Sequence, residues 1–323
     1  MAKELLFFVS TTLIDGIQSL KSHNTMLSFS LRFQKKFVSM MKPLHIIAFS
    51  VLLGSCVPPD KVYNEDFTLL KTIETNNREL QEISGLVSSV RNPGYLWGHN
   101  DSGSDPSLFL LDSLGRIVLQ VELANAKNRD WEDIAIDPGE MPKLFIGDIG
   151  DNRAVRNEIQ IYKIDEPKYD ESLNQPIKVQ AEMMRIHYGD GARDAETLLY
   201  DTKTRELILL SKRDPEARIY AFQFQNSTSI TMKPIGTMAT TQLTAGDINL
   251  RGDILLKNYN EIMIYKGRND MTAKELLLNG IPKNIAYKPE PQGEAIAWTL
   301  DGKGFCLISE WRNNQPQPLI YYR

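Results

Sequence analysis

A carboxylate that directly precedes a short apolar run recurs five times in this chain, at intervals of roughly 50 residues. Repetition at such a period is typical of solenoids, arrays and propellers, in which each repeat is one structural unit. Each repeat continues with a turn and then with further runs rich in β-branched and aromatic residues, which favour strands. The five carboxylates are those of Glu82, Glu132, Glu196, Asp247 and Glu294.

Four antiparallel strands per repeat form the blade of a β-propeller, so we predict an all-β fold with five blades. A sixth blade would need a hidden repeat between Glu132 and Glu196, and we interpret that long interval as a loop insertion at residues 166–175. The last repeat ends after a third strand at 319–322, and residues 67–73 are expected to supply its fourth strand and to close the ring. Residues 275–281 are expected to be the fourth strand of the fourth repeat. A pair of β-sandwiches is the alternative, but it leaves the recurring acid unexplained.

The first part of the chain has the pattern of a bacterial lipoprotein. We interpret residues 1–40 as an overextended start, 41–56 as a signal peptide, 57–66 as a tether and 67–323 as the propeller. Lys42 is followed by an apolar stretch, 44–53, that is too short to span a bilayer, and small residues precede Cys56. The prediction is therefore a lipidated Cys56 and a place in the cell envelope, on the periplasmic face or the cell surface. An ordinary secretory signal with a chance cysteine is the alternative.

In a propeller the first strand of each blade lines the central channel, and the second strand returns to the same end. The five acids should therefore converge at one mouth of the channel, together with the ends of the second strands. Those ends carry His99, Asn100, Asp101, Asp148, Lys212, Lys257 and Glu310. Five close carboxylates repel one another unless they are compensated. Compensation could come from a calcium ion, which prefers oxygen ligands, from Lys212, Arg213 and Lys257, or from backbone amides of neighbouring blades.

The chain resembles a group of bacterial secreted propeller proteins of undefined function and, more distantly, the SdiA-regulated and gluconolactonase-type propellers, some of which hold calcium in the channel. The full metal-ligand set of the gluconolactonase type has no match here, so its lactonase chemistry does not carry over. The resemblance covers nearly all of the chain after Cys56. It rests on the segments 82–86, 99–103, 131–135, 147–152, 194–196 and 292–297.

These features predict a binding protein of the cell envelope that captures a polar ligand at the acidic mouth, with a calcium ion as the candidate cofactor. A polar small molecule, a glycan or a peptide would suit such a site, and the net charge of −4 argues against nucleic acid. We expect a monomer. The alternatives are a calcium-dependent hydrolase of lactones, esters or phosphoesters, and a structural scaffold. His99, Glu132 and Glu196 are the candidate catalytic residues, but the sequence shows no complete catalytic set.

Overall fold

The computed structural model describes residues 63–64, 67–172, 176–285, 287–290 and 292–323. The chain divides into two units, Met1–Asp60 and Lys61–Arg323, and every described residue belongs to the second. The predicted signal peptide and Cys56 lie outside the described residues. Within the described part, no helix is both long and apolar enough to cross a membrane.

Five sheets make up the described unit, and each is one blade. Blade I contains β3 (Ile83–Ser88), β4 (Leu96–Asn100), β5 (Ser107–Leu111), β6 (Ile117–Leu123) and β10 (Ile177–Val179). Blade II contains β7 (Trp131–Asp137), β8 (Lys143–Asp148), β9 (Ile159–Asp165), β11 (Glu182–Tyr188) and β15 (Ser229–Met232). Blade III contains β12 (Ala195–Asp201), β13 (Glu206–Ser211), β14 (Ala217–Phe222) and β16 (Gly236–Met238). Blade IV contains β17 (Leu243–Ile248), β18 (Ile254–Asn258), β19 (Ile262–Tyr265), β20 (Lys283–Ile285) and β1 (Tyr63–Asn64). Blade V contains β21 (Ala295–Trp298), β22 (Phe305–Ile308), β23 (Leu319–Tyr322) and β2 (Leu69–Ile73).

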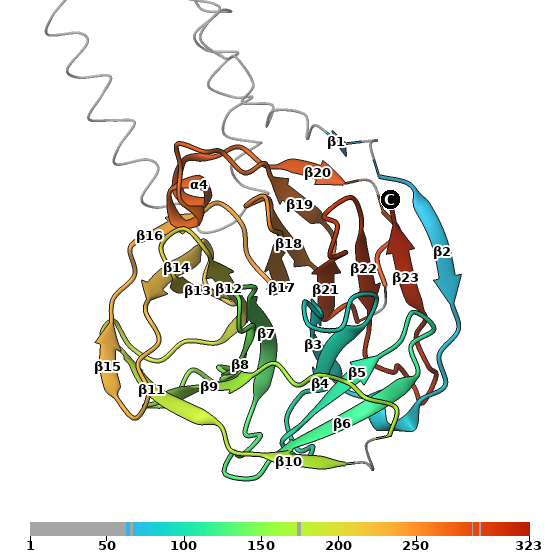
Figure 1. Cartoon of the computed structure of the whole chain (residues 1–323). Coiled ribbons are helices and arrows are strands. Elements are labelled where there is room, and N and C mark those ends of the chain that lie inside the picture. Colours follow the sequence, from blue (N-terminus) through green and yellow to red (C-terminus); the bar gives the residue numbers. More distant parts are fainter. Residues whose placement is uncertain (1–62, 65–66, 173–175, 286, 291) are drawn as a thin grey trace, which may run out of the picture. The chain divides into compact units, whose positions relative to one another are not determined.

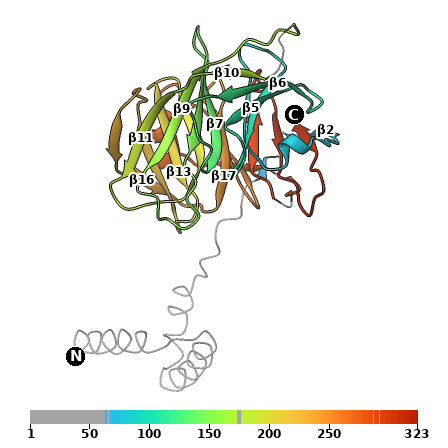
Figure 2. The same cartoon turned by 90° about the horizontal axis from the view of Figure 1, so that it is seen from below.

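The innermost strands β3, β7, β12, β17 and β21 surround a central axis, and each contacts the innermost strands of both neighbouring blades (Figure 1). Seen from the side, the strands run through the thickness of the disc (Figure 2). The core lies between adjacent blades, where side chains from two sheets pack together. One cluster, for example, joins Phe145 and Ile161 of blade II to Leu198 and Tyr220 of blade III. The predicted five-bladed propeller is confirmed.

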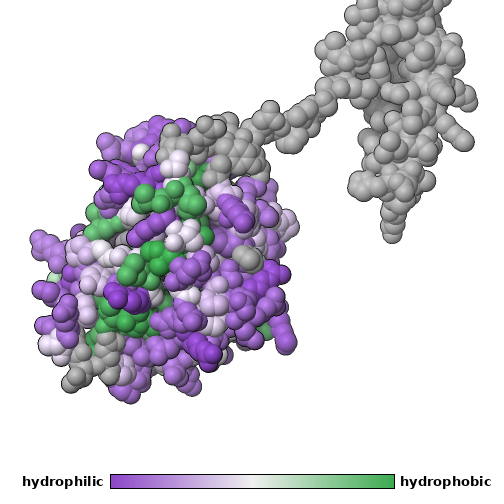
Figure 3. Space-filling model, turned by 90° about the vertical axis from the view of Figure 1, so that its right-hand side faces the viewer, coloured by the Kyte–Doolittle hydropathy of each residue, from purple (hydrophilic) through white to green (hydrophobic). Residues whose placement is uncertain are grey.

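The ring closes as predicted, because β2 pairs with β23 in antiparallel register, with Leu69 opposite Tyr322 and Ile73 opposite Leu319. Phe67 adds packing, since its ring lies 5.3 Å from that of Phe305. The outer side of β2 is solvent-exposed, and Leu69 and Leu70 are 58% and 59% exposed. Figure 3 shows apolar residues at the surface on this side of the molecule.

Three blades carry a fifth strand that runs parallel to the fourth. The insertion predicted at 166–175 leads into β10, which pairs in parallel with β6 of the preceding blade. In the same way β15 pairs with β11, and β1 pairs with β20. Glu166, at the start of this insertion, is fully buried and accepts hydrogen bonds from Ser89 and from the indole of Trp97 (2.9 Å). The long interval therefore reinforces blade I, and the described residues form no sixth blade.

The strand predicted at 275–281 is wrong, because helix α4 (Ala273–Asn279) occupies most of that segment. A capping box begins the helix: the Thr272 side chain accepts from the backbone of Glu275, and the Glu275 carboxylate accepts from the backbone of Thr272. The fourth strand of blade IV is instead β20, which follows the helix. One further short helical turn, η2 (Arg78–Leu80), precedes β3.

Candidate metal and ligand site at one mouth of the channel

Four of the five innermost strands have a β-bulge near their start, at the mouth of the channel. The strands β3, β7, β12 and β17 all shift register at the same place, and the extra residues are Ser84, Glu132, Glu196 and Thr244. Bulges turn a side chain away from the regular alternation of a strand. Ser84 and Thr244 use their hydroxyls to bind a backbone carbonyl of the next blade, that of Glu132 (2.7 Å) and Gly293 (3.0 Å). Glu132 and Glu196 occupy the same position with carboxylates.

These two glutamates belong to a compact cluster of acids. The carboxylates of Asp101, Asp130 and Glu132 place one oxygen each within 4.8 Å of one another, and so do those of Glu132, Asp194 and Glu196. Glu132 is shared by both triplets. Carboxylate oxygens at this spacing are ligands that calcium prefers. Gly150 leaves room for the Glu132 carboxylate, because a Cβ atom at Gly150 would lie 2.0 Å from a Glu132 oxygen.

Glu132 is 4% exposed, and its carboxylate receives no hydrogen bond from any described residue. Burial, followed by the negative charges of Glu196, Asp101 and Asp130, raises its pKa well above the usual range. Burial also raises the pKa of Glu196. Both acids therefore resist ionisation unless a positive charge lies close to them.

Two basic side chains pair with acids of the cluster: Arg213 pairs with Asp194 (2.5 Å), and Lys212 pairs with Glu196. The ammonium group of Lys212 also donates to the hydroxyl of Tyr259 (2.9 Å), which in turn donates to Glu294 (2.8 Å). The neighbouring carboxylates of Glu196 and Glu294 raise the pKa of Lys212 despite its burial. The chain of contacts connects blade III to blade V across the mouth. Glu196 is paired directly and Glu294 is contacted through Tyr259, whereas the charge of Lys212 acts on Glu132 with no hydrogen bond or ion pair among the described residues.

Asp101 and Glu310 lie at the same mouth. Burial raises the pKa of Asp101 to about 7, with smaller contributions from Asp130, Glu294 and Glu82. Burial and the charge of Glu294 raise the pKa of Glu310 to about 8. Glu82 is solvent-exposed, but its charge raises both of these pKa values, so it belongs to the rim of the mouth.

Two side-chain amides position the Asp101 loop. Asn128 donates to the backbone carbonyls of Asn100 (3.0 Å) and Asp101 (2.8 Å). Asn100 donates to the carbonyl of Glu79 (2.6 Å). Asn100 is therefore held within the loop, and Asp101 is fixed beside Asp130.

His99 and Asp148 lie beneath the mouth. The His99 ring is fully buried, and its centroid lies 5.5 Å from that of Trp131 with the two rings nearly perpendicular. Burial lowers the pKa of His99 to about 4. It is therefore neutral near pH 7. Asp148 is also buried, pairs with Arg156 (2.8 Å) and accepts from the backbone of Asp130 (3.2 Å). Both residues support the mouth from below.

Asp247 does not join the other acids. It lies three residues beyond the bulge of β17, where its carboxylate accepts from the backbone of Trp298 (2.8 Å) in the next blade. Asp133 makes the equivalent contact from blade II to Leu198 (2.8 Å) of blade III. The predicted convergence therefore fails at Asp247, which acts as a tie between blades, as one of the sequence-based alternatives expected.

Lys257 is fully buried near the mouth but pairs with Glu290 (3.1 Å) and lies 3.4 Å from the hydroxyl of Tyr287. Its partner comes from the loop before β21 and not from the bulge residues. The two predicted lysines thus serve different acids.

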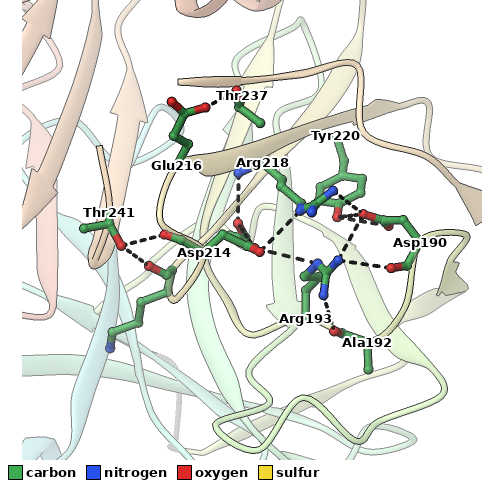
Figure 4. A network of polar contacts seen from close by, with 11 residues as sticks. Asp190, Ala192, Arg193, Asp214, Glu216, Arg218, Tyr220, Thr237 and Thr241 are labelled. Carbon is green, nitrogen blue, oxygen red and sulfur yellow. Dashed lines mark hydrogen bonds and ion pairs between the residues drawn. The ribbon is translucent and has the colours of Figure 1, made fainter. Parts of the chain in front are cut away.

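A second polar network holds the chain segment that leads into Glu196. Arg218 pairs with Asp190 (2.9 Å) and Asp214 (3.3 Å), and Arg193 contacts the same two acids (Figure 4). Tyr220 donates to Asp190 (3.1 Å). The network anchors the turn between β11 and β12 against blade III, and so positions Asp194 and Glu196.

Three residues of the mouth were not among the predicted site residues: Asp130, Asp194 and Tyr259. A signal for the first two exists, because an aspartate stands two positions before each bulged glutamate, at Asp130 and Glu132 and again at Asp194 and Glu196. Tyr259 lies in the turn after β18, and no sequence pattern marks it.

Comparison with known proteins adds little beyond the fold. Neither a protein-family model nor a curated protein sequence matches the chain. Among solved structures it is similar to one titled "Crystal structure of Nidogen/Laminin Complex", with 11% sequence identity and a TM-score of 0.42 over 75% of this chain and 84% of that one. Such a likeness carries no conclusion about activity or partners. The propeller is shown by the five sheets themselves, and the resemblance to secreted bacterial propellers stays a prediction.

Proposed function

We propose that the mouth of the channel binds a calcium ion and, through it, captures a polar ligand. The observation that carries the proposal is Glu132, which is buried, belongs to both acid triplets and has no hydrogen-bond donor among the described residues. Lys212 pairs with Glu196 and, through Tyr259, contacts Glu294, whereas only its longer-range charge acts on Glu132. A hard divalent cation would satisfy the carboxylate that the protein leaves unpaired.

Calcium should raise the melting temperature of the parent protein. The free energy of unfolding should rise with the calcium concentration, by about 2.7 kcal/mol at a hundredfold excess over the dissociation constant. Glu132→Gln should lose most of this gain. In chelator the same variant should be more stable than the parent, because one buried and repelled carboxylate is gone. The two opposite effects are measured by thermal unfolding with calcium and with chelator.

Glu140→Gln is the matched control, since Glu140 is exposed in the turn between β7 and β8 at the other end of the strands. It should respond to calcium like the parent. An unchanged melting temperature of the parent in calcium would rule out the metal site and leave the lysine-paired mouth as the better description.

A calcium-dependent hydrolase is the second candidate function. It is favoured by Asp101 and Glu310, whose pKa values near 7 and 8 suit groups that accept or donate protons at neutral pH. Assays of lactones, esters and phosphoesters with the parent and Glu132→Gln, in calcium and in chelator, separate the two functions. Calcium-dependent turnover that the variant loses would establish the hydrolase, and binding without turnover would establish the capture protein.

The proposed setting is the bacterial cell envelope, with the propeller tethered through a lipidated Cys56. The support is the sequence pattern before Cys56 and the position of the propeller after a short polar stretch. Membrane fractionation of a Cys56→Ala variant tests this, because the variant should leave the membrane fraction if the anchor is correct.

A further inference from the structure

A cavity of about 280 Å³ lies directly beside the acid cluster. Asp130 lines it and is also a member of the first acid triplet. The other charged side chains that line it are Asp151 and three arginines, Arg129, Arg153 and Arg156. A cavity with more basic than acidic side chains therefore adjoins the proposed calcium site, and Asp130 belongs to both.

The three arginines are not equivalent. Arg156 is committed to the protein, because it pairs with Asp148 (2.8 Å) and donates to the carbonyl of Gly150 (2.7 Å). Arg129 and Arg153 are solvent-exposed, and neither makes a hydrogen bond or an ion pair with another described residue. The N–H groups of these two guanidinium groups can therefore donate hydrogen bonds to a ligand in the cavity.

The wall of the cavity is fixed to the second acid triplet. The backbone of Asp151 donates to the Asp194 carboxylate (2.8 Å), and the Asp151 carboxylate accepts from the backbone of Arg156 (2.6 Å). Arg213 pairs with Asp194 (2.5 Å) and also contacts Asn152 in the same loop. The loop that carries Arg153 is therefore held in a defined position relative to Asp194 and Glu132.

The chemistry of the two neighbouring sites is complementary. An acid cluster alone would repel an anion, whereas a bound cation beside two free guanidinium groups attracts one. Arginine presents planar, paired donors that match the oxygens of a carboxylate or a phosphate. We propose that Arg129 and Arg153 bind the oxyanion group, phosphate or carboxylate, of a small organic ligand that also contacts the calcium ion. This inference rests on the proposed function, and it identifies the ligand captured at the mouth as an anion.

The test measures binding of methyl phosphate and of acetate to the calcium-loaded parent protein by isothermal titration calorimetry. We expect at least one of the two anions to bind, and the one that binds identifies the source of the oxyanion. In Arg129→Gln/Arg153→Gln its affinity should fall by at least about tenfold, as the loss of charge-assisted hydrogen bonds implies. Calcium alone should bind the double variant at least as tightly as the parent, since two nearby positive charges are removed.

Arg205→Gln/Arg268→Gln is the matched control, because it removes two exposed arginines from turns at the other end of the strands. It should bind the anion like the parent. Anion affinity that is equal in the parent and in Arg129→Gln/Arg153→Gln would overturn this inference and leave the calcium site intact. If neither anion binds the calcium-loaded parent, this inference is likewise overturned and the calcium site is unaffected. A parent protein that binds no calcium would overturn the proposed function and this inference with it.

Discussion

Replacing Lys212 with methionine is expected to lower the free energy of unfolding by about 3–5 kcal/mol, measured by denaturant unfolding in chelator. The Lys212 and Glu196 side chains are only 5% and 4% exposed. Removing the lysine leaves a buried carboxylate without its partner and also removes the donor to Tyr259. Burial raises the pKa of Glu196 well above 4.5 already in the parent, and loss of the lysine should raise it further. The deficit should therefore grow as the pH rises from the raised pKa of the parent to the higher pKa of the variant.

The chain offers a matched control in Lys178→Met. Lys178 pairs with Glu122 on the surface at 2.8 Å, with side chains 65% and 31% exposed, so its loss should cost less than about 1 kcal/mol. The double variant Lys212→Met/Glu196→Gln should recover part of the loss, because no uncompensated charge is then buried. If Lys212→Met and Lys178→Met lowered the free energy of unfolding equally, the mouth would be open to water and the pair of Lys212 and Glu196 would not be buried.

Deletion of residues 67–73 is the second change with a large expected effect. It removes the β2 ladder with β23, the reciprocal backbone hydrogen bonds between Thr68 and Arg323 (2.9 Å each) and the ring contacts of Phe67 with Trp298 and Phe305. At about 1 kcal/mol for each hydrogen bond, the free energy of unfolding should fall by at least about 4 kcal/mol. Thermal unfolding would show this as a much lower melting temperature.

Leu69→Ala/Leu70→Ala separates the role of the strand from that of its side chains. Both leucines are more than half exposed, so the double substitution should change the stability by no more than about 0.5 kcal/mol. If the deletion were as mild as this control, the ring would be closed by blade V without its N-terminal strand.

The sequence predicted the architecture because the repeated pattern is local. Each blade begins with a buried run such as 195–201, and the turn that follows allows an antiparallel return. The last repeat lacked a fourth strand and the run at 67–73 lacked a partner, so the sequence predicted that these two ends pair and close the ring. The prediction failed at α4, where Leu276 and Leu277 look like strand residues, although the capping box at Thr272 and Glu275 indicates a helix.

The candidate site was predictable only in part. Counting from the first apolar run placed Asp247 with the glutamates, but the bulge shows that the residue of β17 equivalent to Glu132 and Glu196 is Thr244, and Asp247 lies three positions further along the strand. Burial separated His99 from the mouth, since the space opposite Gly85 is filled by its ring. Tyr259 and the free arginines come from loops, whose positions depend on neighbouring blades and not on the periodic pattern.

The parallel fifth strands have a consequence for association. A strand at the border of a sheet exposes unpaired amides and carbonyls, to which another chain can add and so nucleate aggregates. In this protein β10, β15 and β1 occupy that position in blades I, II and IV. The outer borders of the five sheets are therefore short: β1 has two residues, β10 and β16 have three and β15 has four, while β2 has five and carries the exposed Lys71. Short strands and lysines are both poor templates for intermolecular pairing, so the propeller limits fibril-like growth at these borders.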